Sequence, residues 1–434
     1  MLMLCFRFLL LVVITLAVFP PSLVHAQWSV TPRVYLEERY DDNIFLEERD
    51  EQDDFIVTIS PGANVIYQGP TGELNVDYEF RRSFYSDFSE LDFSGHRGVA
   101  TARKDFAVWF GAGVRETLIR AQDPLELTGL EEFERPSIRT GPRNRYVRNI
   151  VEPEVTFRYA ENRSLVLGYR NNLLRNKRDD IADQDENAIN ARLTFRINVN
   201  NGVEGFYEHA DQNYDQTIPP GPSRDFKYDE FYGKYTYYFN PTLSTSLEYR
   251  YYQRDFERET ARFPDYKVHD PRLGITWNII ENVSLSANAG YAIRDAENGD
   301  DDESFSGEGN LSGTYKRLTL TLFGETGFGG DFGTAEALGS FEFWRTGVNG
   351  TYQLLERLVA RGSYYLERDR FLDIDRRDTL WNVEGEMSYQ LFNWLFASFT
   401  YQYNKRDSNV FLRDYGNNRY FLRITLQYDI AAFF

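Results

Sequence analysis

Cysteine, histidine and long apolar runs are scarce in this sequence, and each shortage excludes a class of protein. The only cysteine among the 434 residues is Cys5, so the chain that follows it can form neither a disulfide nor a cysteine-ligated metal site. The four histidines include no pair at a metal-binding spacing, and no catalytic constellation stands out. We therefore expect no cofactor, no metal site and no enzymatic activity.

Positive charge is also in deficit. The sequence contains 48 Lys and Arg residues against 67 Asp and Glu residues, which gives a net charge of −19. Surfaces that bind nucleic acid are basic, so this balance argues against a nucleic-acid partner. It is compatible with acidic loops that face a cation-bridged layer of lipopolysaccharide.

The one long apolar run lies near the N-terminus and predicts a cleaved secretory signal peptide over residues 1–26. Arg7 supplies the positive n-region, Phe8 to Phe19 form the apolar h-region, and Val24-His25-Ala26 offers a small-residue cleavage site. A membrane anchor is the competing interpretation, but a spanning helix needs about 20 apolar residues. We therefore expect export of a mature chain that comprises residues 27–434.

Aromatic residues, in contrast, are abundant. They make up 16% of the chain although 26% of its residues are charged. Transmembrane β-barrels combine these two properties, because girdles of aromatic side chains lie at both bilayer interfaces while the lumen is polar.

Short turns separate segments in which apolar and polar residues alternate, as in Leu74 to Phe80. Alternation is the period of a β-strand, and the segments are long enough to cross a bilayer, which takes about 9–11 residues of strand. The turns recur roughly every 40 residues. They are expected at 69–72, 103–105, 161–163, 200–202, 240–242, 281–282, 316–317, 356–357 and 392–393.

The connections between these hairpins are longer and acidic, an asymmetry typical of outer-membrane barrels with short periplasmic turns and long extracellular loops. The longest, Ile119 to Arg145, is rich in arginine. It is predicted to fold inward as a constriction or to cap the mouth, and the alternative is contact with lipopolysaccharide phosphates. The candidate constriction residues are Arg135, Arg139, Arg143 and Arg145.

Together these patterns predict an all-β fold, a transmembrane antiparallel up-and-down outer-membrane β-barrel of about 18–20 strands over residues 27–434. A β-propeller also repeats near 40 residues, but each of its repeats needs four short strands. A barrel of this size leaves an aqueous channel.

The strand period places many charged residues on the inward face. Guanidinium groups suit carboxylate and sugar oxygens, and one hypothesis is that part of the arginine set forms a lane for an anionic or polyhydroxylated polymer. Alternatively, Arg and Glu pair across neighbouring strands and stiffen the wall. The lumen-facing candidates are Arg158, Arg170, Arg192, Arg196, Arg250, Arg254, Arg361, Arg423, Glu79, Glu152, Glu154, Glu248, Glu384 and Glu386.

The last sixteen residues alternate again and end on an aromatic side chain. This segment resembles the closing strand of bacterial outer-membrane barrels, whose C-terminal aromatic residue is read by the barrel-assembly machinery. The resemblance implies that Tyr428 and Phe434 belong to an assembly signal.

A second resemblance concerns the first strands. The segments Tyr40 to Phe45, Asp54 to Ile56 and Ile59 to Gly62 are similar to the N-terminal signature of the putative β-barrel porin 2 family. This family includes barrels that occur with exopolysaccharide and PEP-CTERM gene clusters. Membership implies an outer-membrane barrel of a Gram-negative bacterium, and an exit pore for secreted polysaccharide that works with a periplasmic polysaccharide-export protein.

Three functions stay open at this point. The first is a channel for export of extracellular polysaccharide or for general diffusion. The second is a structural or adhesive surface barrel with an occluded lumen, and the third is an outer-membrane enzyme that modifies lipids or glycans. The expected partners are outer-membrane lipids and lipopolysaccharide, the barrel-assembly machinery, the periplasmic export protein and the polysaccharide cargo.

Overall fold

The fold consists almost entirely of antiparallel β-strands in the computed structural model, which describes residues 27–122, 144–179, 181–215, 224–260, 262–297, 301–332 and 336–433. Within these ranges no helix is long and apolar enough to cross a membrane. A short 3₁₀ helix, η1 (Ser89–Leu91), lies in the connection after the third strand. The strands are β1 (Gln27–Asp41), β2 (Asp54–Gly69), β3 (Gly72–Tyr85), β4 (Phe93–Ala107), β5 (Phe110–Ala121), β6 (Tyr146–Ala160), β7 (Arg163–Asn176), β8 (Asp183–Asn198), β9 (Asn201–Asp215), β10 (Phe226–Asn240), β11 (Leu243–Phe256), β12 (Tyr266–Ile280), β13 (Val283–Ala296), β14 (Asp302–Tyr315), β15 (Leu318–Asp331), β16 (Gly339–Leu355), β17 (Leu358–Phe371), β18 (Arg377–Phe392), β19 (Leu395–Ser408), β20 (Tyr415–Gln427) and β21 (Ile430–Phe433).

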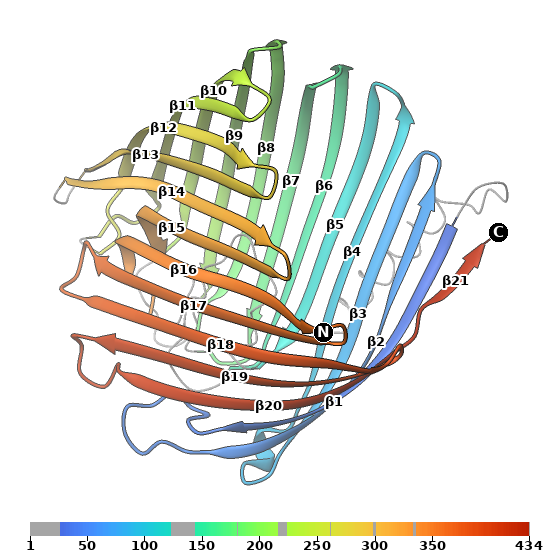
Figure 1. Cartoon of the computed structure of the whole chain (residues 1–434). Coiled ribbons are helices and arrows are strands. Elements are labelled where there is room, and N and C mark those ends of the chain that lie inside the picture. Colours follow the sequence, from blue (N-terminus) through green and yellow to red (C-terminus); the bar gives the residue numbers. More distant parts are fainter. Residues whose placement is uncertain are drawn as a thin grey trace.

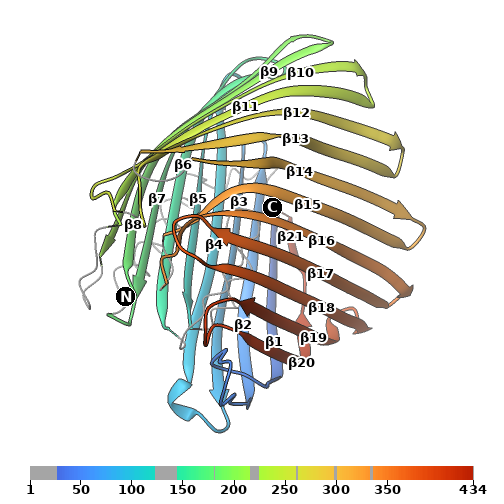
Figure 2. The same ribbon diagram turned by 90° about the vertical axis from the view of Figure 1, so that its left-hand side faces the viewer.

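The strands form one closed antiparallel barrel (Figures 1 and 2). Each strand from β1 to β19 pairs with the next strand along the chain. Both β20 and β21 pair with β1, which closes the sheet. Because β20 and β21 follow one another along the same neighbour, they fill one position in the wall. The described residues therefore make a barrel of twenty strands, which confirms the predicted fold class and the upper value of the expected strand number.

Side chains alternate between the two faces of this wall, as the strand period requires. In β1, Leu36 is exposed on the outward face, whereas Glu37 and Arg39 are buried on the inward face. The register between β1 and β20 pairs Leu36 with Ile424 and Glu37 with Arg423. The outward and inward faces therefore stay in phase where the barrel closes.

The two ends of the barrel differ. One end carries the short turns and the other the long loops, and eight of the nine predicted turns lie at or beside their expected positions. The expected turn at 103–105 was wrong, because β4 continues to Ala107 and the chain turns at Val108 and Trp109 instead. These two residues are apolar, so the sequence pattern gives no turn signal at this position. The rings of Trp109 and Phe110 are in contact, with 5.7 Å between their centroids.

A buried polar network ties the long-loop end of β1 to β20. Asn417 donates from Nδ2 to Oδ1 of Asp41 at 2.6 Å, and Nε of Arg419 lies 3.1 Å from Oδ2 of the same carboxylate. Asn43 donates from Nδ2 to the carbonyl oxygen of Gly416 at 3.0 Å. Asp41, Asn43 and Asn417 are completely buried. The network therefore joins the first loop to the last strands at the closing seam.

The wall is interrupted between β14 and β15. Their pairing stops at Gly307 and Thr326, although residues 302–306 of β14 continue to pair with β13 and residues 327–331 of β15 continue to pair with β16. A Cβ on Gly307 would lie 2.4 Å from the carbonyl oxygen of Asn288, so only glycine fits at this point. The two strands diverge from here toward the long-loop end (Figure 1).

Candidate constriction in the lumen

The end of β15 lies inside the barrel. The register places Phe328 and Gly330 on the outward side of β15. Phe328 nevertheless packs against a buried cluster whose members include Phe226 and Tyr266, on the inward faces of β10 and β12. A Cβ on Gly330 would lie 2.7 Å from the guanidinium of Arg254, which also points inward from β11. The tip of the β15–β16 hairpin therefore lies across the inner face of the wall. We call residues 327–332 and 336–343 the inward hairpin.

A contact made by β14, the strand on the other side of the interruption, confirms this placement independently. Ser304 on the inward face of β14 donates from Oγ to Oε1 of Glu342 at 2.5 Å, although the register puts Glu342 on the outward face of β16. Arg370 of β17 donates from Nε to Oε2 of Glu342 at 2.9 Å. An inward side chain of β14 thus meets an outward side chain of β16. At this point β16 must therefore lie on the lumen side of β14.

Aromatic contacts hold one side of the inward hairpin. The ring of Phe332 lies 5.3 Å from that of Phe226 and 5.4 Å from that of Phe256, measured between centroids. The guanidinium of Arg254 lies 4.7 Å from the Phe332 ring centroid. Aromatic pairs of this kind contribute about 0.5–1.5 kcal/mol each beyond the area they bury.

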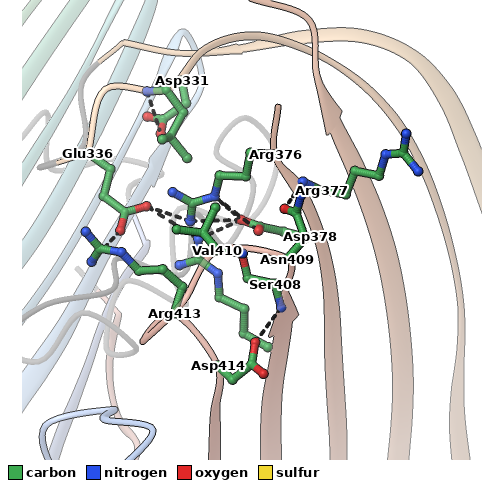
Figure 3. A network of polar contacts seen from close by, with 12 residues as sticks. Asp331, Glu336, Arg376, Arg377, Asp378, Ser408, Asn409, Val410, Arg413 and Asp414 are labelled. Atoms are coloured by element: carbon green, nitrogen blue, oxygen red, sulfur yellow. Dashed lines mark hydrogen bonds and ion pairs between the residues drawn. The ribbon is translucent and has the colours of Figure 1, made fainter. Parts of the chain in front are cut away.

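An ionic cluster holds the other side (Figure 3). The carboxylate of Glu336 lies 2.8 Å from Arg376, 2.8 Å from Arg413 and 3.4 Å from Arg406. Asp378 in turn lies 3.1 Å from Arg376 and 2.6 Å from Arg406. These partners belong to β18, β19 and the connections beside them. The inward hairpin therefore bridges two separate parts of the wall, β10–β13 and β18–β20.

Other loops contact the same hairpin. Arg262 donates to the carbonyl oxygen of Glu336 at 2.7 Å, and Arg224 donates to that of Phe332 at 3.3 Å. Burial lowers the pKa of Arg224. Beside them, Arg294 lies 3.3 Å from Asp373 in the β17–β18 connection; burial raises the pKa of this carboxyl, and the guanidinium opposes the rise. Charged groups from four connections thus converge at the long-loop end of the lumen.

The turn of the inward hairpin depends on a glycine. Gly339 has φ +87°, and a Cβ there would lie 3.0 Å from the carbonyl oxygen of Arg262. Left-handed backbone costs other residues roughly 1–2 kcal/mol. We expect Gly339→Ala to lower the free energy of unfolding by about that amount, measured by urea unfolding in vesicles with tryptophan fluorescence.

Gly385 in β18 supplies the control for this change, since the described residues leave open space around a Cβ added there. Gly385→Ala should leave the unfolding free energy almost unchanged. Equal losses from the two substitutions would contradict the role assigned to the conformation of Gly339.

The register places all fourteen lumen-facing candidates on the inward face, where most meet a charge of opposite sign. Arg170 lies 2.6 Å from Glu186 and 2.8 Å from Glu208, so one guanidinium joins two further strands. The remaining pairs are Arg250 with Glu230, Arg158 with Asp105, Arg361 with Glu386, Arg423 with Glu37, Glu79 with Arg81, Glu248 with Lys234 and Glu154 with Arg103. Glu384 accepts from Gln402, Arg254 lies among aromatic rings, and Glu152 shares the register of Arg115.

Arg192 and Arg196 on β8 differ from the paired arginines. Among the described residues neither makes an ion pair. The guanidinium of Arg192 lies 5.6 Å from the ring centroid of Phe206, and that of Arg196 lies 3.6 Å from the ring centroid of Tyr238. Arg196 also donates from Nε to the carbonyl oxygen of Asn198 at 2.9 Å. No carboxylate of the described residues therefore neutralises either cation.

Some predicted residues lie outside the described ranges. They are the signal peptide over residues 1–26, the loop residues Arg135, Arg139 and Arg143, and Phe434. Arg145 is described: it donates to Oε1 of Gln122 at 2.8 Å and to the carbonyl oxygen of Glu90 at 3.1 Å. It thus fastens the base of its loop to the neighbouring connection. Tyr428, between β20 and β21, donates its backbone N–H to Pro32 at 3.2 Å.

The inward hairpin was not predicted from the sequence. Its segment reads as an alternating strand, and its connection is short. The available signal is the glycine-rich run over 324–333, in which Phe328 and Phe332 are interspersed with glycines. Such a run allows the backbone to approach other strands closely.

A closed antiparallel barrel with short turns at one end, long loops at the other and a charged lumen is a bacterial outer-membrane β-barrel. The chain belongs to the family described as putative beta-barrel porin 2, whose model matches residues 194–428. The match confirms the predicted family through a different region from residues 40–62, on which the resemblance was argued. The protein is therefore an outer-membrane barrel of a porin-like family.

Solved structures agree on the fold. The siderophore receptor PirA from Acinetobacter baumannii superposes with a TM-score of 0.55 at 8% identity, over 93% of this chain and 80% of that chain. The FrpB iron transporter of Neisseria meningitidis gives 0.53 at 10% identity, over 93% and 82%. A mutant of the ferric enterobactin receptor PfeA from Pseudomonas aeruginosa gives 0.54 at 10% identity, over 92% and 80%. No curated protein sequence matches the chain.

Proposed function

We propose that this barrel is a channel of the outer membrane and that its cargo is an extracellular polysaccharide. Barrels of 16–18 strands already leave an aqueous channel, and this one has twenty strands in its described part. Side chains alone do not fill such a lumen. Its inward face is charged and polar, as passage of a hydrated polymer requires.

One observation supports an anionic or polyhydroxylated cargo. Arg192 and Arg196 face the lumen from the same strand with no ion-pair partner among the described residues, whereas Arg170 and Arg250 are paired with glutamates. A guanidinium presents several N–H donors in a plane, which suits carboxylate and sugar oxygens. The ring beneath each guanidinium supports its orientation.

The double substitution Arg192→Glu/Arg196→Glu should therefore shift the ion selectivity of the channel toward cations. Reversal potentials of the refolded barrel in planar bilayers, under a salt gradient, measure this shift. Arg170→Glu is not a suitable control because it also breaks two ion pairs. Arg49→Glu in the β1–β2 connection is the control, since that side chain is 65% exposed. Unchanged selectivity in the double variant would count against the lane.

The partners belong to the same proposal. Outer-membrane lipids and lipopolysaccharide surround the outward face, and the barrel-assembly machinery recognises the end of the chain that contains Tyr428. A periplasmic polysaccharide-export protein delivers cargo to the short-turn end. The signal peptide over residues 1–26 directs export of the chain and is removed.

The test of this function is genetic and electrical. Deletion of the gene should abolish extracellular polysaccharide, and the wild-type gene should restore it. Retention of the polysaccharide would contradict export and leave general diffusion. Labelling of the protein by a serine-directed or glycan-directed covalent probe would contradict the assignment to transport without covalent chemistry.

The inward hairpin favours one second candidate, a surface barrel whose lumen is occluded. The hairpin bridges β10–β13 and β18–β20, so it narrows the lumen at the long-loop end. Conductance separates the two functions, because an occluded barrel stays silent in a planar bilayer under all conditions.

A further inference from the structure

We propose that Arg376, Arg406 and Arg413 form a binding site for the carboxylate of an acidic saccharide, and that Glu336 occupies this site when cargo is absent. The proposal rests on the proposed transport function. It adds the charge class of the cargo and a means by which cargo displaces the inward hairpin.

Two of the three guanidinium groups are held in place independently of Glu336. Asp378 lies 2.6 Å from Arg406 and 3.1 Å from Arg376, and it belongs to the wall strand β18 rather than to the inward hairpin. Asp378 thus positions two of the three arginines from behind. If Glu336 left, these two side chains would keep their places and face the lumen.

Two arginines of the site are buried, which strengthens their attraction for a carboxylate. The third is exposed, which gives a ligand access to the site. The side chains of Arg376 and Arg406 are only 5% and 3% exposed, whereas that of Arg413 is 42% exposed. Charge–charge attraction is stronger in such a desolvated setting than in water. A ligand would first meet Arg413, which lies on the side of Glu336 away from Asp378 in Figure 3.

The chemistry of the present occupant identifies the ligand. Glu336 presents a carboxylate to three guanidiniums, which are geometrically suited to bind that group with two parallel hydrogen bonds. A uronic acid residue presents the same group. A polymer of such residues supplies many carboxylates at high local concentration beside the site, so it can compete with a single tethered one.

Displacement of Glu336 would loosen the hairpin, because it removes the ionic contacts with Arg376, Arg406 and Arg413 that hold one of its two sides. β15 has no pairing with β14 beyond Thr326. The remaining contacts of the tip include the Phe332 rings and the hydrogen bonds from Arg262 and Arg224 to its backbone. Binding of cargo and widening of the lumen are therefore coupled through Glu336.

The experiment measures binding of oligogalacturonate to the refolded barrel, residues 27–434, in lipid nanodiscs by calorimetry. Neutral maltooligosaccharide of equal length is the comparison. Loss of one charged hydrogen-bonding partner corresponds to about a tenfold change in affinity. Glu336→Gln removes the competitor and should strengthen oligogalacturonate binding about tenfold. Arg413→Gln should weaken it by a similar factor.

Glu356→Gln is the matched control, since Glu356 is exposed in the short turn between β16 and β17, at the other end of the barrel. It should leave the affinity unchanged. Equal affinity in wild type and Glu336→Gln, or equal binding of the neutral oligosaccharide, would overturn the proposal. Heat-modifiable migration in gels verifies that each variant is folded, and the exposed Arg413 keeps the test informative if Glu336→Gln fails to fold.

The outcome is separate from that of the proposed function. A barrel that conducts and is needed for polysaccharide secretion, yet shows no effect of Glu336→Gln on binding, would remain a polysaccharide channel without this site. A barrel that binds oligogalacturonate as expected but is dispensable for secretion would retain the site and lose the assigned cargo.

Discussion

Replacement of residues 332–338 by an Asn-Gly turn should raise the single-channel conductance of the refolded barrel several-fold. The substitution removes Phe332 and Glu336, and with them the aromatic and ionic contacts that hold the inward hairpin across the lumen. Asn-Gly is a favoured two-residue connection between paired strands, and Asp331 and Gly339 are paired at this place. The shortened hairpin can then lie within the wall.

The control for this prediction is deletion of residues 48–51 from the β1–β2 connection, which lies outside the lumen cluster and is largely exposed. That deletion should leave conductance at the wild-type value. If both variants conducted like the wild type, the inward hairpin would not be the element that narrows the channel.

Asp41→Ala should be the most destabilising single substitution at the closing seam. It removes the carboxylate that accepts from Asn417 and faces Arg419, a guanidinium whose side chain is only 3% exposed. Breaking a buried ion pair by removal of one partner costs about 3–5 kcal/mol. The free energy of unfolding from urea titration in vesicles should fall by that amount.

Glu51→Ala, in the exposed part of the same connection, serves as the control and should change the unfolding free energy little. A loss for Asp41→Ala no larger than that for Glu51→Ala would show that the seam does not depend on this network. The comparison separates closure of the barrel from the general stability of its first loop.

Most of the wall could be predicted from the sequence because one physical rule governs it. Lipid contacts one face of each strand and the lumen contacts the other, so residues such as Leu36 and Glu37 must alternate. The same rule assigned Arg170 and Arg192 to the inward face. The turn at Val108 and Trp109 escaped because aromatic residues at a bilayer interface are favourable both in strands and in turns.

The inward hairpin could not be predicted by this rule, for a physical reason. Alternation tells which side of a strand a residue occupies, but not whether that strand remains in the wall. Phe328 lies on the formally outward side of β15 and is partly buried by protein instead of lipid. Both environments are apolar, so the sequence pattern is the same.

The sequence also could not show which inward-facing arginines form ion pairs. Arg170 and Arg192 share an inward face and the same residue pattern, yet of the two only Arg170 forms ion pairs with glutamates on neighbouring strands. Register between strands decides this, and register depends on turn lengths and bulges, such as the irregularity between Arg196 and Asn198.

The most direct test of the inward hairpin is a choice between two disulfides, since residues 27–434 contain no cysteine. Ser304→Cys/Glu342→Cys joins side chains that touch in this structure. Ser304→Cys/Gly329→Cys joins positions that would lie opposite one another if the pairing of Gly307 with Thr326 continued along β14 and β15. We predict that the first pair cross-links in outer membranes and that the second does not. Cross-linking of the second pair alone would place β15 in the wall and contradict the account.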